Sequence, residues 1–197
     1  MLKKKEIIYR EILNRALFKN IIEFTQLEIS KLFNISLSTT HNALKPLINM
    51  GAVSSSARSF KIINIKKILL YWATVRKLSN DIIHKGKIDM PVNKIESSLP
   101  DGVAFTAYSG YRLLYNDAPA DYSEVYVYAD LKTLKEIKNR FNNKGRYYNL
   151  FVLEKDKFLE GNIVPLPQIY VDLWNLSEWY AQDYLNAIEK RFFEKWK

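Results

Sequence analysis

Apolar residues recur at helical spacing over residues 5–19 and form one stripe along a predicted first helix. The members of this stripe are Ile8, Ile12, Leu13, Ala16 and Leu17. Residues 20–24 are too few for another helix, so we expect a connection that becomes briefly extended.

Two further helices are predicted from capping residues followed by apolar positions. Thr25 and Glu28 fit a capping box and begin a second helix that ends at about Phe33. Ser36 caps a third helix that runs to about Asn49 and ends at a glycine. The expected inner faces are Leu27, Ile29, Leu32 and Phe33 on the second helix, and Leu37, Thr40, Leu44, Leu47 and Ile48 on the third. Pro46 predicts a kink or an irregular last turn.

The next residues predict a hairpin and then a long helix. Residues 52–54 and 60–63 are strand-like and flank a polar turn, which completes a winged helix-turn-helix. A linking helix from Ile65 to about His84 follows, and glycine and proline break the pattern over residues 85–91. The chain is therefore expected to form a DNA-binding domain over residues 1–84 and a second domain over residues 91–197.

The second half alternates between helical and strand patterns. Strands are expected over residues 103–107, 124–128 and 147–153, and helices over residues 92–98, 110–115, 131–141, 166–175 and 178–196. This order predicts a small mixed α/β domain, so that the whole chain belongs to the α+β class.

The positive charge is confined to the first half of the chain. Residues 1–90 contain 16 Lys and Arg against 6 Asp and Glu, whereas residues 91–197 contain 14 against 15. A uniformly basic composition would spread this excess evenly. The asymmetry favours a polyanion, and specifically nucleic acid, as the partner of the first domain.

Several classes of site are excluded by composition. The chain has no cysteine, which rules out disulfides, thiolate metal sites and cysteine nucleophiles. Its two histidines, His41 and His84, have no recognisable catalytic or metal motif around them. No apolar run is long enough to span a membrane, and the first residues are basic without the apolar stretch of a secretory signal. We therefore expect a cytoplasmic protein with no metal, no cofactor and no membrane partner.

The third helix should present a polar face to the major groove of double-stranded DNA. Opposite its apolar stripe lie Ser38, Thr39, Asn42 and Lys45, with His41 at the flank. Asn42 can pair with adenine, Ser and Thr can bond base edges or phosphates, and Lys45 supplies charge. In the wing, Arg58 is the first candidate for a phosphate or minor-groove contact, and Lys61 is the second.

The last third of the chain resembles a known family. Residues 164–175, Val-Pro-Leu-Pro-Gln-Ile-Tyr-Val-Asp-Leu-Trp-Asn, followed by an amphipathic helix, are similar to the end of AbiEi-type regulators and antitoxins of type IV toxin–antitoxin systems. In that family a winged helix precedes a nucleotidyltransferase-like domain. The resemblance implies autoregulatory DNA binding, with an antitoxin role and a cognate toxin protein as further implications.

An active nucleotidyltransferase needs a Gly-Ser turn followed by two carboxylates at alternate positions of a strand, which together hold Mg²⁺. Here Ser109 and Gly110 stand in reversed order, and the strand offers Glu124 followed by tyrosines at 126 and 128. The other nearby acids are Asp117, Asp121 and Asp130. With the carboxylate pair incomplete, no catalytic residues are assigned and the domain is predicted not to be an enzyme.

Two features of the second half have more than one interpretation. The tyrosines can form a partner or ligand surface or simply fill a small core; they are Tyr108, Tyr111, Tyr115, Tyr122, Tyr126 and Tyr128. Asp172 can be a buried hydrogen-bonding acid or a surface acid. The leading hypothesis is a homodimeric DNA-binding transcriptional regulator, with the linking helix around Trp72 at the dimer contact. The alternative is an active nucleotidyltransferase that uses the winged helix to find its substrate.

Overall fold

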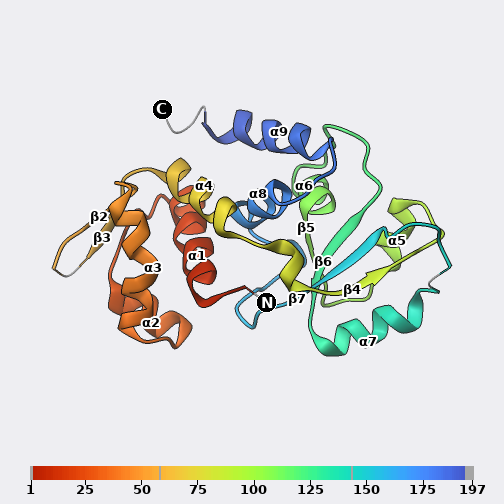
Figure 1. The fold of residues 1–197 in the computed structure, drawn as a ribbon, viewed down its shortest axis with the longest axis horizontal. Coiled ribbons are helices and arrows are strands. Elements are labelled where there is room, and N and C mark those ends of the chain that lie inside the picture. Colours follow the sequence, from red (N-terminus) through yellow and green to blue (C-terminus); the bar gives the residue numbers. More distant parts are fainter. Residues whose placement is uncertain (1, 58, 143, 194–197) are drawn as a thin grey trace. The chain divides into compact units, whose positions relative to one another are not determined.

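The computed structural model describes residues 2–57, 59–142 and 144–193, and in it the chain forms two compact units. The first unit extends from Leu2 to Arg76, and the second begins at Lys77. Both contain helices and a sheet, so the α+β class is confirmed (Figure 1).

The first unit contains four helices and a small antiparallel sheet in strand order β1-β3-β2. Its elements are α1 (Lys4–Lys19), β1 (Glu23–Phe24), α2 (Gln26–Phe33), α3 (Leu37–Asn49), β2 (Val53–Ser55), β3 (Phe60–Ile62) and α4 (Ile65–Val75). The extended connection, the second and third helices and the hairpin therefore form where the sequence predicts them.

The predicted caps begin α2 and α3. The hydroxyl oxygen of Thr25 accepts a hydrogen bond from the backbone N–H of Glu28 at 3.0 Å, and that of Ser36 accepts one from Thr39 at 3.1 Å. The second half of the predicted capping box does not form. The Glu28 carboxylate instead accepts a charge-assisted bond from Arg15 at 2.5 Å.

Three leucines that were expected on inner faces are exposed. Leu27, Leu32 and Leu37 are 50%, 43% and 50% exposed, respectively. A helix as short as α2 needs only Ile29 and Phe33, which are four residues apart, to reach the core. On α3 the buried positions start one turn after Leu37, and the helix continues past its proline to Asn49.

A hydrogen-bonded core holds α1 against α3 and α4. The Tyr9 hydroxyl donates to the carbonyl oxygen of Ala43 at 2.7 Å. The Glu6 carboxylate accepts from Trp72 Nε1 at 3.1 Å and from Arg76 Nη1 at 3.3 Å. Glu6, Trp72 and Arg76 are all buried, so the ion pair is completed away from water.

The second unit is built on a mixed four-stranded sheet in the order β4-β7-β6-β5. The outer pairs are antiparallel, and the central pair, β6 and β7, is parallel. Its elements are a 3₁₀ turn (Leu78–Asp81), β4 (Ile82–Gly86), α5 (Val92–Ser98), β5 (Ala104–Thr106), α6 (Ala107–Tyr115), β6 (Val125–Ala129), α7 (Leu131–Arg140), β7 (Leu150–Glu154), α8 (Leu166–Trp174) and α9 (Ala181–Phe193).

The linking helix is shorter than predicted, and this moves the domain boundary. Helix α4 ends at Val75, and residues 82–86, expected to be the end of that helix and its break, form strand β4. The strand forms because β7 offers an antiparallel partner about 70 residues further along the chain, with His84 opposite Val152. The boundary therefore falls between Arg76 and Lys77, not at residues 85–91.

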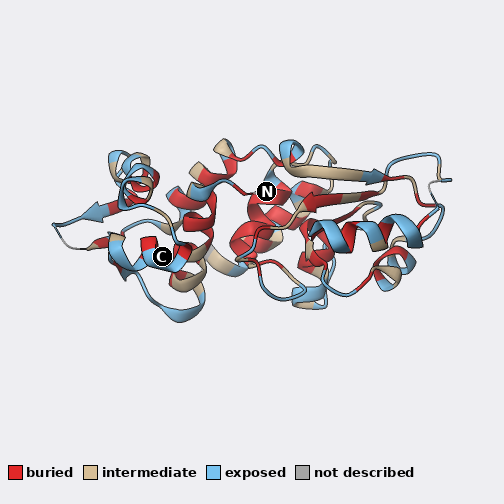
Figure 2. Ribbon diagram, turned by 90° about the horizontal axis from the view of Figure 1, so that it is seen from below, coloured by how far each residue is buried: buried red, intermediate tan, exposed pale blue. Residues whose placement is uncertain are grey.

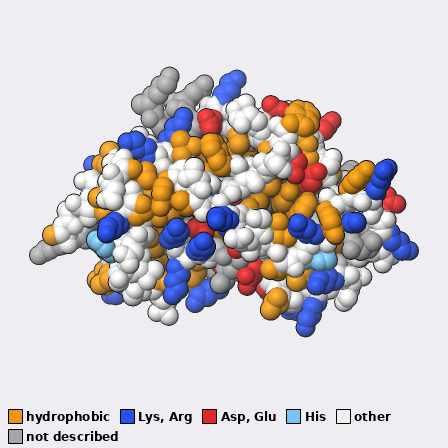
Figure 3. Space-filling model, in the orientation of Figure 1, with side chains coloured by type: hydrophobic (Ala, Val, Ile, Leu, Met, Phe, Trp, Pro, Cys, Tyr) orange, Lys and Arg blue, Asp and Glu red, His pale blue; other side chains and the backbone are white. Residues whose placement is uncertain are grey.

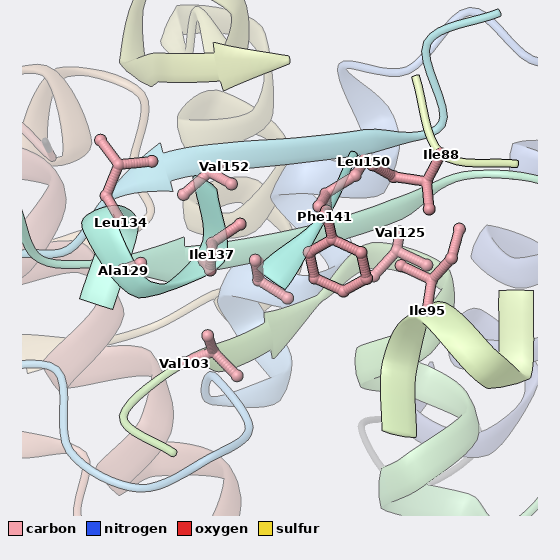
Figure 4. Packing of buried hydrophobic residues seen from close by; sticks show 11 residues of the cluster. Ile88, Ile95, Val103, Val125, Ala129, Leu134, Ile137, Phe141, Leu150 and Val152 are labelled. Carbon is pink, nitrogen blue, oxygen red and sulfur yellow. The ribbon is translucent and has the colours of Figure 1, made fainter. Parts of the chain in front are cut away.

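Alternate residues of β6 point to opposite faces of this sheet. Val125, Val127 and Ala129 belong to an apolar cluster with Ile95 of α5 and side chains of α7 (Figure 4). On the opposite face Tyr126 packs against Tyr108 of α6. All five positions of β6 are buried. In contrast, buried and exposed positions alternate along the helices (Figure 2).

None of the helices in the described part of the chain is both long and apolar enough to cross a membrane.

Candidate nucleic-acid interface

Helix α3 is fixed in place from its buried side. Thr40, Ala43, Leu44 and Leu47 are buried at the i, i+3, i+4 and i+7 spacing of one helical face. The bond from Tyr9 to the Ala43 carbonyl ties the same face to α1. The orientation of the opposite face is therefore set by the core.

That opposite face is polar and solvent-exposed. Ser38, His41, Asn42 and Lys45 are exposed, and Thr39 is partly exposed. In the part of the chain that the structure describes, the side chains of the four exposed residues make no internal hydrogen bond or ion pair. The Thr39 hydroxyl lies 2.8 Å from that of Ser36 and is engaged in the helix cap. Four of the five predicted residues on α3 are therefore available to a ligand, and Thr39 is less so.

The hairpin between β2 and β3 is closed by serine hydrogen bonds. The backbone N–H of Ser56 donates to the carbonyl of Ser59 at 2.8 Å, and the Ser59 hydroxyl donates to the Glu23 carboxylate at 2.8 Å. Lys61 is exposed on β3, opposite Glu23 of β1. The other predicted wing contact, Arg58, lies outside the described residues.

The structural boundary sharpens the charge asymmetry. Residues 2–76 contain 13 Lys and Arg against 4 Asp and Glu, whereas residues 77–197 contain 17 of each. The whole net charge of +9 therefore belongs to the first unit.

Arginines pair with most of the acids of the first unit. Arg15 pairs with Glu11 and Glu28, and Arg76 pairs with Glu6. The excess positive charge is thus supplied largely by lysines, and Lys and Arg side chains are visible over this unit in Figure 3.

A dimer contact along the linking helix around Trp72 stays a prediction, but Trp72 itself does not lie on an exposed face. Its side chain is fully buried in the core of the first unit, where it donates to Glu6. Helix α4 is amphipathic, and its buried residues are Ile68, Leu69, Trp72 and Ala73.

In the second unit, the place where a nucleotidyltransferase would have its carboxylate pair is β6, and a single acid lies at its start. Glu124 precedes β6, and the alternate positions Tyr126 and Tyr128 are buried. Tyr126 stacks on Phe151 with 4.6 Å between ring centroids. The Tyr128 hydroxyl donates to Asp172 at 2.8 Å. Both tyrosines are therefore used within the fold.

The first turn of α6 is tightly packed. Ala107 has a positive φ of 50°, and a Cβ on Gly110 would lie 3.0 Å from the carbonyl oxygen of Phe105. Ser109 is fully buried, and its hydroxyl has no hydrogen-bond partner among the described residues. Ser109 and Gly110 thus allow α6 to lie close to β5, and neither is exposed to a substrate.

The neighbouring aspartates have separate environments. Asp117 pairs with Arg191 at 2.9 Å, and Asp121 is exposed. Asp130 caps α7 by accepting from the backbone N–H of Thr133 at 2.8 Å. This bond lowers the pKa of Asp130. Among the described residues no group of three or more acidic or histidine side chains is placed to hold a metal ion.

Most of the clustered tyrosines fill the core. Tyr108, Tyr111, Tyr126 and Tyr128 are buried, and only Tyr115 and Tyr122 are partly exposed. Asp172 is also buried, and its Oδ2 accepts from Thr106 as well as from Tyr128. The core interpretation of the tyrosines and the buried-acid interpretation of Asp172 are therefore correct.

Sequence reasoning missed a pair of acids near this tyrosine core. The hydroxyl of Tyr180 donates to Glu124, and that of Tyr108 donates to Glu178 at 3.3 Å. Burial, and secondarily the nearby Glu178, raises the pKa of Glu124. In the sequence, Glu178 and Tyr180 lie more than 50 residues after Glu124, so nothing local indicates that they meet it.

A scan against protein-family models finds none that matches this chain, and searches of curated proteins and of solved structures also find no match.

Proposed function

We propose that the first unit is a winged helix-turn-helix that binds double-stranded DNA and that the protein is a transcriptional regulator. The observation that carries this proposal is the exposed polar face of α3 on the unit that holds the whole net positive charge. The element order, with a three-residue turn between α2 and α3 and a hairpin after them, supports it.

In this proposal α3 enters the major groove. Asn42 is exposed and unpaired, so its amide can donate to and accept from the edge of an adenine. Lys45, one turn further along the helix, contacts a phosphate or a guanine edge. Lys61 and Arg58 contact the backbone from the wing, while Ser38 and His41 contact the groove beside Asn42.

The second unit is proposed to be a nucleotidyltransferase-like domain without transferase activity. The order β5–α6–β6–α7–β7 supports the fold, and the internal use of Tyr126 and Tyr128 supports the loss of activity. Under the resemblance to AbiEi-type proteins, this domain serves dimerisation or binds a toxin protein, and the regulator represses its own gene. Co-purification with the product of a neighbouring gene tests the toxin partner.

DNA binding is tested by fluorescence anisotropy with the full chain and duplex DNA from upstream of its own gene. Binding is electrostatic in part, so log Kobs should fall linearly with log salt, with a slope of about 0.9 for each phosphate contacted. Lys45→Gln should reduce this slope by about 0.9 if Lys45 contacts a phosphate. Asn42→Ala should weaken specific binding by about 1–3 kcal/mol and change non-specific binding little.

The matched control is Lys135→Gln, which removes the same charge from an exposed position of α7 on the neutral second unit. It should bind DNA as the unmodified protein does. Equal losses in Lys45→Gln and Lys135→Gln would refute the assignment of the interface to α3.

A further inference from the structure

A cleft of about 450 Å³ lies in the second unit, where β6 and β7 begin. It is lined by Asp89, from the connection after β4, and by Glu124, directly before β6. The segment before β7 contributes Arg146, Tyr147 and Tyr148 to the same lining. This cleft is not part of the polar face of α3 and meets the tyrosine core only at Glu124, which accepts from Tyr180. Its volume is within the range of small-molecule sites.

The segment after β4 and the segment before β7 are held together by specific contacts. The Asn149 side chain accepts from the backbone N–H of Ile88 and donates to the Ile88 carbonyl, both at 2.8 Å. The backbone N–H of Gly145 donates to the Lys87 carbonyl at 2.7 Å. A Cβ on Gly145 would lie only 2.8 Å from the carbonyl carbon of Lys87, so the segments approach closely. The cleft is therefore formed before any ligand arrives.

The acids that line the cleft are Asp89 and Glu124. Within the described ranges neither Asp89 nor Glu124 forms an ion pair with Lys or Arg. Glu124 is half-buried and accepts from the phenol of Tyr180, and Glu178 lies near enough to raise its pKa further. A ligand ammonium at this position would offset both the burial and the like-charge repulsion.

The segment before β7 is aromatic and basic. Tyr147 and Tyr148 are 69% and 49% exposed, although each has a large apolar ring. The Arg146 guanidinium lies 5.2 Å from the centroid of the Tyr147 ring, and Lys87 Nζ lies 4.8 Å from that of Tyr148. Arg146 is therefore placed beside the rings, where it can donate two parallel bonds to a carboxylate.

We propose that this cleft binds a free α-amino acid. A simple anion would meet Asp89 and Glu124, and a simple amine would meet Arg146, whereas a zwitterion matches both charges. The ammonium group bonds to Glu124 and Asp89, the carboxylate bonds to Arg146, and the side chain packs on Tyr147 and Tyr148. This site goes beyond the proposed DNA binding and is independent of it.

Isothermal titration calorimetry of the full chain without DNA tests the proposal, with each of the common amino acids as titrant. At least one should bind with a Kd below about 1 mM. For that amino acid, the analogue without the amino group and the amine without the carboxylate should each bind at least about tenfold more weakly.

Variants locate the site. Glu124→Gln and Arg146→Gln should each weaken binding at least about tenfold, with the far-ultraviolet circular dichroism unchanged. The matched controls are Glu160→Gln and Lys135→Gln, at exposed positions outside the cleft, which should bind as the unmodified protein does.

Three results would overturn the proposal: no binding of any amino acid at about 10 mM, undiminished binding by both cleft variants, or equal binding of the amine alone. The calorimetry contains no DNA, so a failure to bind amino acids does not refute the proposed DNA binding. Likewise, a failure to bind DNA does not refute the amino-acid site.

Discussion

Removal of the Glu6 carboxylate should destabilise the first unit severely. In the native protein this carboxylate accepts from the indole of Trp72 and from the guanidinium of Arg76, and the Glu6 and Arg76 side chains are 2% and 1% exposed. The substitution Glu6→Ala removes the carboxylate from the buried Arg76 guanidinium and leaves the indole N–H without this acceptor.

The cost can be estimated from these contacts. Breaking a buried ion pair by removing one partner typically costs about 3–5 kcal/mol. Since a whole domain is stabilised by only about 5–15 kcal/mol, this is a large share of the free energy of unfolding. Glu11→Ala is the matched control, because its pair with Arg15 is also an ion pair from α1 but is partly exposed at 27% and 19%. A partly exposed pair should contribute less than about 1 kcal/mol.

Urea unfolding followed by tryptophan fluorescence measures both variants in the full chain. Trp72 is the only tryptophan in residues 2–76 and is next to the substituted group. With Trp174, Trp179 and Trp196 replaced by phenylalanine in every variant, the emission reports on the first unit. The expected result is a large shift of the Trp72 transition to lower urea for Glu6→Ala and a small one for Glu11→Ala. Similar shifts for the two variants would refute the claim that the buried Glu6 pair contributes more to the free energy of unfolding than the partly exposed Glu11 pair.

Three further substitutions test local features. Ser36→Ala removes the cap of α3 and should lower the free energy of unfolding by about 1 kcal/mol in the same urea assay; no change would contradict the cap. Gly145→Ala forces a Cβ against the Lys87 backbone and should cost about 1–3 kcal/mol, and a neutral result would mean that the segments can separate. Because the bond from Thr133 lowers the pKa of Asp130 in the folded state, its carboxylate stabilises the fold above about pH 4 and loses this effect as the pH falls. Asp130→Asn should therefore show a smaller loss of stability on acidification in urea unfolding at several pH values, and an unchanged pH dependence would contradict this.

Local signals in the sequence predict most elements of the first unit, although not the end of α4. Thr25 and Ser36 begin helices because each hydroxyl reaches a backbone N–H three residues ahead, a contact that needs no tertiary partner. The exposure of Asn42 and Lys45 followed in the same way, from their position opposite an amphipathic stripe.

Features that depend on distant partners were not predictable in this way. Residues 82–84 are predicted as the end of the linking helix and residues 85–86 as its break, and they form a strand because β7 lies beside them. The exposure of Leu27 and Leu37 likewise depends on which turn of each short helix meets the core. The burial of Asp172 requires Thr106 and Tyr128, which lie 66 and 44 residues away.

The salt dependence of duplex binding tests the central claim most directly. We predict that the full chain binds double-stranded DNA from upstream of its own gene, that affinity falls steeply as salt rises, and that Asn42→Ala loses the preference for this DNA over unrelated duplex. Absence of duplex binding at low salt, or an affinity that does not change with salt, would contradict the account.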